Sequence, residues 1–329
     1  PFPTFTATPV AQPTMPPATT AQTTPAAPQS ASLPAALYLL TSNGQVARLD
    51  ADGSTVTLLT NEPEPIVAFD ISPTDGRLAY PVGAALFEIL PDGTRIHKAQ
   101  STDDWETGPR FSPDGTAIYF YQTGVGLQRI PIGVDAVATL VLAEATPTVT
   151  ESDGIERVTW PRQHYPSSWS PDGRYLVLVA CDLDCGLREL FDLQTQRLIP
   201  LTINDPVDQR EVAPLGQWSW PPQAAAPLMT TDGLMGPRSA VMRADPLTGD
   251  VIVLFKQLTI GATTYELPHM LSTWPVDDET FFVVGAPAEG AQTHLYQVDQ
   301  QGIATPLMAV GGAFPDVGDG LLWANDGSG

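Results

Sequence analysis

The sequence predicts an all-β protein folded as a six-bladed β-propeller, and three observations lead to this prediction. A turn motif repeats along most of the chain, a β-hairpin motif follows it, and no segment shows a sustained helical period of apolar residues. The 329 residues suffice for one large all-β domain. Seven blades are the alternative, if the long region around blade five contains a further sheet.

The turn motif follows a strand that ends in a large apolar residue. Its clear copies, each built on Ser-Pro and Asp-Gly, lie at residues 72–76, 112–115 and 170–173. Proline presets φ, aspartate accepts hydrogen bonds from backbone N–H groups and glycine adopts positive φ, so each copy predicts a tight turn. We interpret these pairs as structural: Asp75, Gly76, Asp114, Gly115, Asp172 and Gly173. Weaker copies lie at residues 218–221, 274–278 and 317–320.

Hairpins of alternating apolar residues around polar or glycine-containing turns are interleaved with this motif. They occupy residues 46–60, 87–96, 187–202, 241–255 and 295–308. Such alternation is typical of half-buried antiparallel pairs. The repeat region has about 48 residues per unit, which is close to the spacing of four-stranded propeller blades.

The two ends of the repeat region complement each other. Residues 37–60 supply only three strands and lack the strand that precedes the turn, whereas residues 314–325 supply such a strand. We therefore expect the N- and C-terminal segments to pair within one blade. This pairing closes the ring and removes exposed edge strands.

The first 34 residues differ in composition from the rest, with nine Pro, eight Thr and seven Ala, and the first charged residue of the chain is Arg48. Such a segment has too little apolar area to offset the entropy of ordering it. We expect residues 1–34 to form an extended, non-globular arm that spans roughly 100 Å if it is polyproline-II-like. A lipid-modified cysteine upstream of Pro1 fits this arrangement, and residues 35–329 form the propeller.

The charge balance is strongly acidic, with a formal net charge of −22 and a sequence pI of about 4.2. Such a surface repels a phosphate backbone, so nucleic acid is excluded as a partner. A transmembrane helix is also not expected, because no apolar run approaches the roughly 20 residues that span a bilayer.

The repeats resemble those of a known family. The Ser-Pro-Asp-Gly turns, together with the hairpin at residues 46–60, are similar to the WD40-like repeats of TolB-type propellers. This resemblance covers residues 36–325 and implies a six-bladed propeller outside the cytoplasm that serves as a protein-binding platform. TolB-type proteins carry an N-terminal α/β domain where this chain has the arm. An arm followed by such a propeller resembles bacterial surface lipoproteins.

Two cysteines, Cys181 and Cys185, lie four positions apart. A metal site would need further ligands nearby, and neither a second cysteine pair nor a histidine pair is adjacent. The alternatives are a pair of reduced thiols and a local disulfide across a hairpin loop. An extracytoplasmic location favours the disulfide, which would contribute about 2 kcal/mol.

Candidate binding residues lie just before the turn-preceding strands and in polar loops. These segments are expected to line one rim of the central channel. The candidates are Trp105, Arg110, Trp160, His164, Tyr165, Glu211, Tyr265 and His269. A histidine and carboxylate set around a propeller axis is how the lyases of this fold hold a metal, but here the histidines are few and from non-adjacent blades, so surface histidines are the other interpretation.

No catalytic motif is recognised: a Gly-x-Ser-x-Gly sequence and a glycine-rich phosphate loop are both absent. The sequence therefore predicts a non-enzymatic, extracytoplasmic accessory protein without cofactor or metal. Its arm would tether it to a membrane or to a larger envelope or surface assembly, and a protein partner would bind a loop-bearing face. The first alternative is a small-ligand protein or a metal-dependent, carbohydrate-active, lyase-like enzyme with its site at the channel rim. The second is a structural component of a surface layer or filament.

Overall fold

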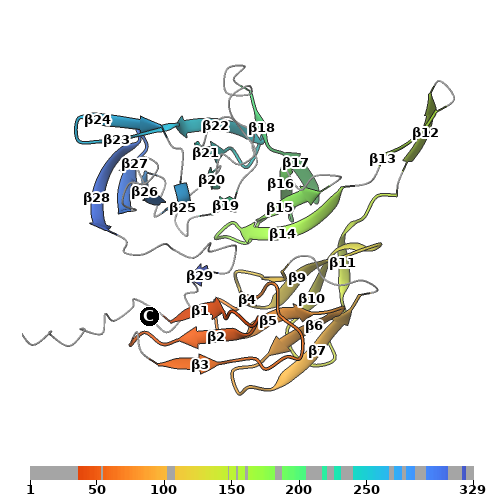
Figure 1. Cartoon of the computed structure of the whole chain (residues 1–329). Coiled ribbons are helices and arrows are strands. Elements are labelled where there is room, and N and C mark those ends of the chain that lie inside the picture. The colour runs from red at the N-terminus through yellow and green to blue at the C-terminus, as the bar shows by residue number, and fades with distance from the viewer. Residues whose placement is uncertain are drawn as a thin grey trace, which may run out of the picture.

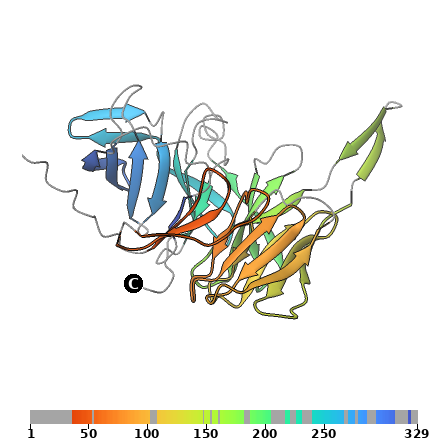
Figure 2. The same cartoon turned by 60° about the horizontal axis from the view of Figure 1, so that its bottom comes forward.

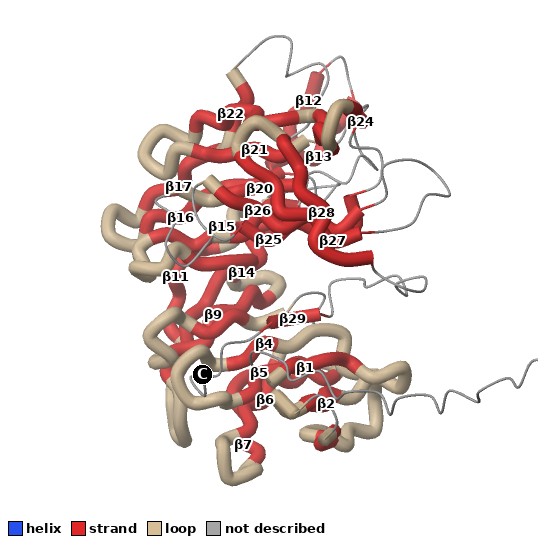
Figure 3. The backbone as a smooth tube through the Cα atoms, turned by 90° about the vertical axis from the view of Figure 1, so that its left-hand side faces the viewer, coloured by secondary structure: helices blue, strands red, loops and turns tan. Residues whose placement is uncertain are grey.

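The computed structural model describes residues 36–52, 55–101, 108–146, 148–152, 155–159, 162–181, 187–204, 217–220, 226–230, 240–266, 270–275, 279–285, 294–309 and 321–323. Every regular element within these ranges is a β-strand, as predicted (Figure 3). No helix long and apolar enough to cross a membrane is found in the described part of the chain.

Six sheets form the blades of the propeller, which are arranged around a common centre (Figure 1). Blade 1 contains β29 (Leu321–Trp323), β1 (Leu37–Leu40), β2 (Val46–Leu49) and β3 (Val56–Leu58). Blade 2 contains β4 (Asp70–Ile71), β5 (Leu78–Val82), β6 (Ala85–Ile89) and β7 (Arg95–Gln100). Blade 3 contains β8 (Arg110–Phe111), β9 (Ala117–Gln122), β10 (Gly126–Pro131) and β11 (Thr139–Ala143).

The other three blades follow in chain order. Blade 4 contains β14 (Gln163–Trp169), β15 (Tyr175–Cys181), β16 (Leu187–Asp192) and β17 (Arg197–Pro200). Blade 5 contains β19 (Gln217–Ser219), β20 (Leu228–Thr230), β21 (Val241–Ala244) and β22 (Asp250–Phe255), with β18 (Thr202–Ile203) beside β22. Blade 6 contains β25 (Met270–Pro275), β26 (Thr280–Gly285), β27 (His294–Asp299) and β28 (Ile303–Ala309), with β23 (Gln257–Ile260) and β24 (Thr263–Glu266) added.

The ring is closed by pairing of the two ends of the repeat region, as predicted. Strand β29 pairs antiparallel with β1, with Leu37 opposite Trp323. The closing strand differs from the prediction in one respect: it follows the turn motif at 317–320 instead of preceding it. That motif itself lies outside the described residues. The first strand of each of blades 2 to 5 is the inner one, because β4 contacts β8, and β14 contacts both β8 and β19.

The turn motif has the chemistry that the sequence predicts. In two copies the serine hydroxyl donates a 2.6 Å hydrogen bond to the aspartate, from Ser112 to Asp114 and from Ser170 to Asp172. These bonds lower the pKa of each aspartate, so the carboxylates stay ionised and hold the turns. Gly115 has a φ of 66°, a region that glycine adopts without strain. The Asp-Gly pairs are therefore structural in the described turns.

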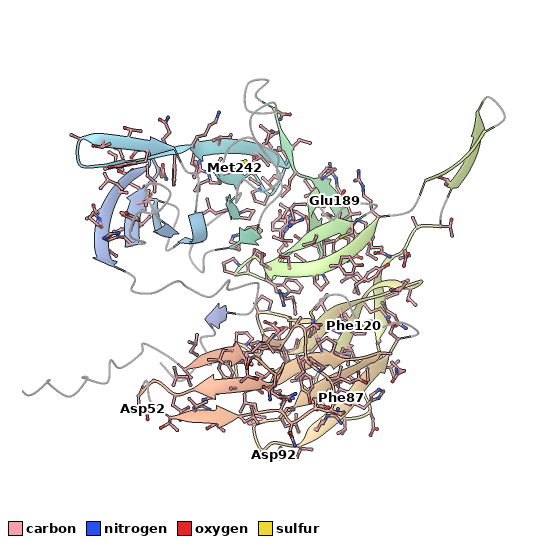
Figure 4. The ribbon with its side chains drawn as sticks, viewed as in Figure 1. Asp52, Phe87, Asp92, Phe120, Glu189 and Met242 are labelled. Carbon is pink, nitrogen blue, oxygen red and sulfur yellow. The ribbon has the colours of Figure 1, made fainter. Side chains whose placement is uncertain are left out.

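Apolar side chains fill the spaces between neighbouring blades. One cluster joins blades 3 and 4, where Leu176 and Leu178 are fully buried against Leu127. Trp169 packs there edge-on against Tyr119, with 4.7 Å between the ring centroids. Met242, labelled in Figure 4, belongs to a similar cluster between blades 4 and 5.

A buried ion pair also joins blades 2 and 3. The Lys98 ammonium lies 3.2 Å from Glu88 Oε2 and donates to the carbonyls of Pro131 and Gly133 at 2.8 and 2.6 Å. The Glu88 carboxylate in turn accepts hydrogen bonds from Gly133 N–H and from Arg77. Both partners of the pair are almost completely buried, at 0% and 1% side-chain exposure.

Three strands and one hairpin are added to the plain propeller. Strand β18 runs parallel to β22, and β23 runs parallel to β28, so the chain leaving one blade covers the outer edge of the next. Between blades 3 and 4, β12 (Thr148–Ser152) and β13 (Ile155–Thr159) form a separate two-stranded sheet. Figures 1 and 2 show this hairpin projecting away from the blades.

Candidate functional site

The two ends of the propeller differ in their connections. In blades 2, 3 and 4 the inner strand runs toward its Ser-Pro-Asp-Gly turn, and the following strands alternate in direction. We call that end the turn end, because tight turns such as 72–77 and 193–196 join the strands there. The opposite end, the loop end, receives the long connections between blades, among them residues 101–109, 144–162 and 201–216. Surfaces built from such loops are where binding function concentrates.

A three-residue polar cluster lies at the loop end of blade 4. His164, near the start of inner strand β14, places Nε2 2.8 Å from Oε2 of Glu189. Arg162 donates from Nη1 to the other oxygen of the same carboxylate, also at 2.8 Å. Glu189 itself, labelled in Figure 4, is 4% exposed. Both carboxylate oxygens are therefore engaged.

The electrostatics of this cluster favour an ionised carboxylate. Burial acts to raise the pKa of Glu189, but the His164 hydrogen bond and the Arg162 charge outweigh it, so the pKa lies below its ordinary value. An imidazole held in this way by a buried carboxylate has a fixed orientation. Because Nε2 is taken by Glu189, only Nδ1 of His164 is left to meet a ligand.

A second polar cluster lies beside the first, at the loop end of blade 3. The Tyr121 hydroxyl and the Gly124 N–H both donate to Glu144 Oε2, at 2.5 and 2.7 Å. Tyr165 from blade 4 meets Tyr121 edge-on at 4.6 Å between ring centroids and donates to Gln163 at 2.6 Å. Burial, and then the bond to Glu144, raise the pKa of Tyr121, which therefore remains a neutral donor.

The inner strands carry a third polar set. Asp70 on β4 accepts a 2.7 Å hydrogen bond from Phe111 N–H on β8, and Arg110 on β8 donates at 2.6 Å to the carbonyl of Ser167 on β14. Each of these side chains thus links its own blade to the next. Burial raises the pKa of Asp70 despite the nearby Arg110 charge. These contacts make Arg110, a predicted rim residue, part of the blade-to-blade connection.

The structure brings together some of the predicted site residues and separates others. His164 and Tyr165 lie in the two neighbouring loop-end clusters, and Arg110 lies on the inner strand beside them. Tyr265 lies on β24, the strand of blade 6 farthest from inner strand β25, so its predicted position at the channel rim is wrong. The reason is that residues 257–266 form an added hairpin at the outer edge of the sheet before the chain reaches the inner strand. Four candidates lie outside the described residues: Trp105, Trp160, Glu211 and His269.

The predicted disulfide is described only in part. Cys181 is 4% exposed at the end of β15 and packs with Tyr121 and Tyr165. Cys185 lies outside the described residues, so the pairing stays a prediction. Within the described ranges no group of three His, Cys, Asp or Glu side chains is placed to hold a metal ion.

Three residues that organise the loop end and the inner strands were not among the predicted ones: Asp70, Glu144 and Glu189. Asp70 could have been found from the repeats, because it occupies the same place before its turn as Arg110 does before the next. Glu189 belongs to a strand in which apolar and polar residues alternate, and in such a strand an ionisable residue is expected to face solvent. Nothing in the local sequence around Glu144 indicates that Tyr121 approaches it.

Comparisons with known proteins agree with this architecture. No protein family matches the sequence, and no curated protein matches it either. The xyloglucanase of glycoside hydrolase family 74 from Xanthomonas campestris has a TM-score of 0.53 and 15% identity over 83% of this chain and 43% of its own. TolB structures are among those with a similar propeller fold. TolB from Acinetobacter baumannii gives a TM-score of 0.47 and 15% identity over 81% of this chain.

The matched proteins differ widely in what they do. This chain spans 61% of the length of the Acinetobacter TolB. Virginiamycin B lyase from Staphylococcus aureus gives a TM-score of 0.46 and 12% identity, over 83% of this chain and 84% of its own. At such identities the likeness concerns the fold alone, and a propeller hosts many unrelated functions.

Proposed function

We propose that this chain is a non-enzymatic, extracytoplasmic propeller that binds a protein partner through its loop end. In this proposal the Pro- and Thr-rich arm of residues 1–34 tethers it to a membrane or to a larger assembly, as an accessory subunit. The acidic surface, with a net charge of −22, disfavours nucleic acid and anionic lipid as partners and favours a protein.

One observation carries the proposal most directly: two carboxylates at the loop end, both within the described residues, are used to hold the fold together. Glu189 is enclosed by His164 and Arg162, and Glu144 is occupied by Tyr121 and the Gly124 amide. General acid–base catalysis needs a group within reach of substrate and free to exchange its proton. Groups satisfied in this way instead stabilise a fixed surface, which suits recognition of a partner.

The test is extraction of the native cells with mild detergent, followed by native-gel separation and identification of the band that contains this chain. We expect migration within a larger complex, and loss of that complex when residues 1–34 are deleted from an otherwise folded propeller. Migration of the intact chain alone, at the 35.1 kDa of the free protein, would contradict the proposal.

A second candidate function has one observation in its favour. The His164 imidazole is oriented by a buried carboxylate at the loop end, which is also an arrangement that small-ligand sites and enzymes use. Metal analysis of chelator-free protein, repeated with His164→Ala, separates the two candidates. A stoichiometric ion that the substitution removes supports the ligand-binding alternative, and its absence supports the protein-binding proposal.

An oxidising location also predicts the state of the two cysteines. We expect Cys181 and Cys185 to be joined by a disulfide in protein prepared from its native location. Thiol titration of the denatured protein should then find no free thiol before reduction and two after it, since the chain has 2 cysteines. Two thiols without reduction would argue against an extracytoplasmic location.

A further inference from the structure

The chain is held by side-chain hydrogen bonds on both sides of the β12–β13 hairpin. On the outgoing side, Glu144 accepts the hydrogen bonds of Tyr121 and Gly124, and its own N–H donates to Val125 O at 3.0 Å. On the returning side, Arg162 is held by Glu189 at 2.8 Å. The Tyr121–Tyr165 ring contact at 4.6 Å joins the two sides. The polar clusters of the loop end are thus the base from which the hairpin emerges.

Beyond this base the hairpin has no support from the described blades. Its two strands form a sheet of their own, with five residue pairs from Thr148 opposite Thr159 to Ser152 opposite Ile155. Figures 1 and 2 both show it clear of the neighbouring blades. A lone two-stranded hairpin is only marginally stable in water, and an additional strand or surface beside it supplies the missing stabilisation. A hairpin with a fixed base and unsupported strands is therefore suited to binding another molecule.

The charges of the ribbon indicate the kind of molecule. The register places Glu151 directly opposite Glu156, and Val149 directly opposite Val158, with all four on one face of the ladder. Like charges at opposite positions destabilise a hairpin, because their Cβ atoms are about 5 Å apart. A lysine or arginine on a segment that pairs beside this ladder supplies the opposite charge.

We infer that the β12–β13 hairpin binds an extended, lysine- or arginine-bearing segment of a partner protein. The inference rests on the proposed function and names the surface and the partner chemistry for it. Two copies of this chain repel each other at a net charge of −22, which disfavours self-association through the β12–β13 hairpin.

The probe is a short, fluorescently labelled peptide of alternating lysine and threonine, titrated with the full chain at low salt. A peptide of alternating glutamate and threonine is its control. We expect binding of the lysine peptide only, weakened at least about tenfold by Glu151→Lys. That substitution places opposite charges across the ladder and so favours the hairpin, which means that weaker binding cannot result from hairpin melting.

Glu64→Lys is the matched control, because Glu64 is exposed in the connection between β3 and β4 and the substitution changes the net charge equally. Binding to this variant should stay within about twofold of the original chain. Equal weakening by both substitutions, or unchanged binding after replacement of residues 148–159 by a Gly/Ser linker, would overturn the inference. So would a hairpin-dependent dimer in sedimentation velocity.

The native complex separates failure of this inference from failure of the proposed function. A complex that persists in cells expressing the linker variant leaves the proposed function standing and removes the hairpin from it. If the lysine peptide binds in a manner that depends on Glu151, but the chain migrates alone, the hairpin inference is supported and the proposed function is contradicted.

Discussion

Removal of the Glu144 side chain should free the segment that leads from blade 3 into the β12–β13 hairpin, while leaving the propeller folded. In Glu144→Ala, the Tyr121 hydroxyl and the Gly124 N–H both lose their acceptor. Hydrogen bonds to a charged group contribute about 1.5–3 kcal/mol each, so their joint loss is about 3 kcal/mol or more. Tyr121 is only 5% exposed, so water cannot readily replace the acceptor for its hydroxyl.

Amide hydrogen exchange at Gly124 measures the loss of the second bond directly. The Gly124 amide loses this one bond, and about 1.5–3 kcal/mol corresponds to exchange that is about ten- to a hundredfold faster at this amide. Glu144→Gln is the control, because its amide oxygen can still accept one of the two bonds, and its effect should be much smaller. Unchanged exchange at Gly124 in Glu144→Ala would refute the view that Glu144 fixes the segment leading into the hairpin. Acceleration throughout blade 3 would instead mean global destabilisation.

Three further outcomes follow from the buried groups. Lys98→Met should destabilise the protein by about 3 kcal/mol in denaturant unfolding, because two buried carbonyls lose their donor and Glu88 keeps only Arg77 as a charged partner, and a change under about 1 kcal/mol would contradict this. Asp70→Asn should melt no lower than the original chain at neutral pH, because its pKa is raised and the neutral amide still accepts from Phe111, whereas Asp70→Ala should lower the Tm. The Arg174 hydrogen bond lowers the pKa of Asp192 to about 2, so the stability that this pair contributes is present above about pH 4 and lost as the pH falls toward about 2. The difference in Tm between the original chain and Asp192→Asn should therefore shrink in that acidic range, and a constant difference would argue against the pairing.

Much of the fold could be predicted because its determinants are local. A Ser-Pro-Asp-Gly turn holds itself together through bonds such as Ser112 to Asp114, within two residues. The predicted hairpins at 46–60, 87–96, 187–202, 241–255 and 295–308 all form, because alternating apolar residues and a turn suffice to define an antiparallel pair. Closure was predictable as well, since a ring of blades leaves one place where the missing strand is needed.

The candidate site could be predicted only where it coincides with the repeat. His164 and Tyr165 were found because they lie at the start of an inner strand. Their partners were not, because Glu189 lies two strands away in the sheet and Tyr121 lies in the preceding blade. Tyr265 was misplaced for a related reason: whether a segment between blades continues to the channel or adds to an outer edge depends on which edge is open. That is a property of the assembled sheets.

The hairpin and the loop-end clusters have one physical explanation in common. Carboxylates are costly to bury, and a chain retains them where paired hydrogen bonds fix a geometry that apolar packing alone would not define. Around blades 3 and 4 those fixed positions coincide with the two points where the chain leaves and re-enters the propeller, at Glu144 and Arg162. Rigid anchoring at these points is unnecessary for a connection that merely links two blades. This anchoring is useful if the β12–β13 hairpin must keep a defined direction so that its outer part can bind a partner.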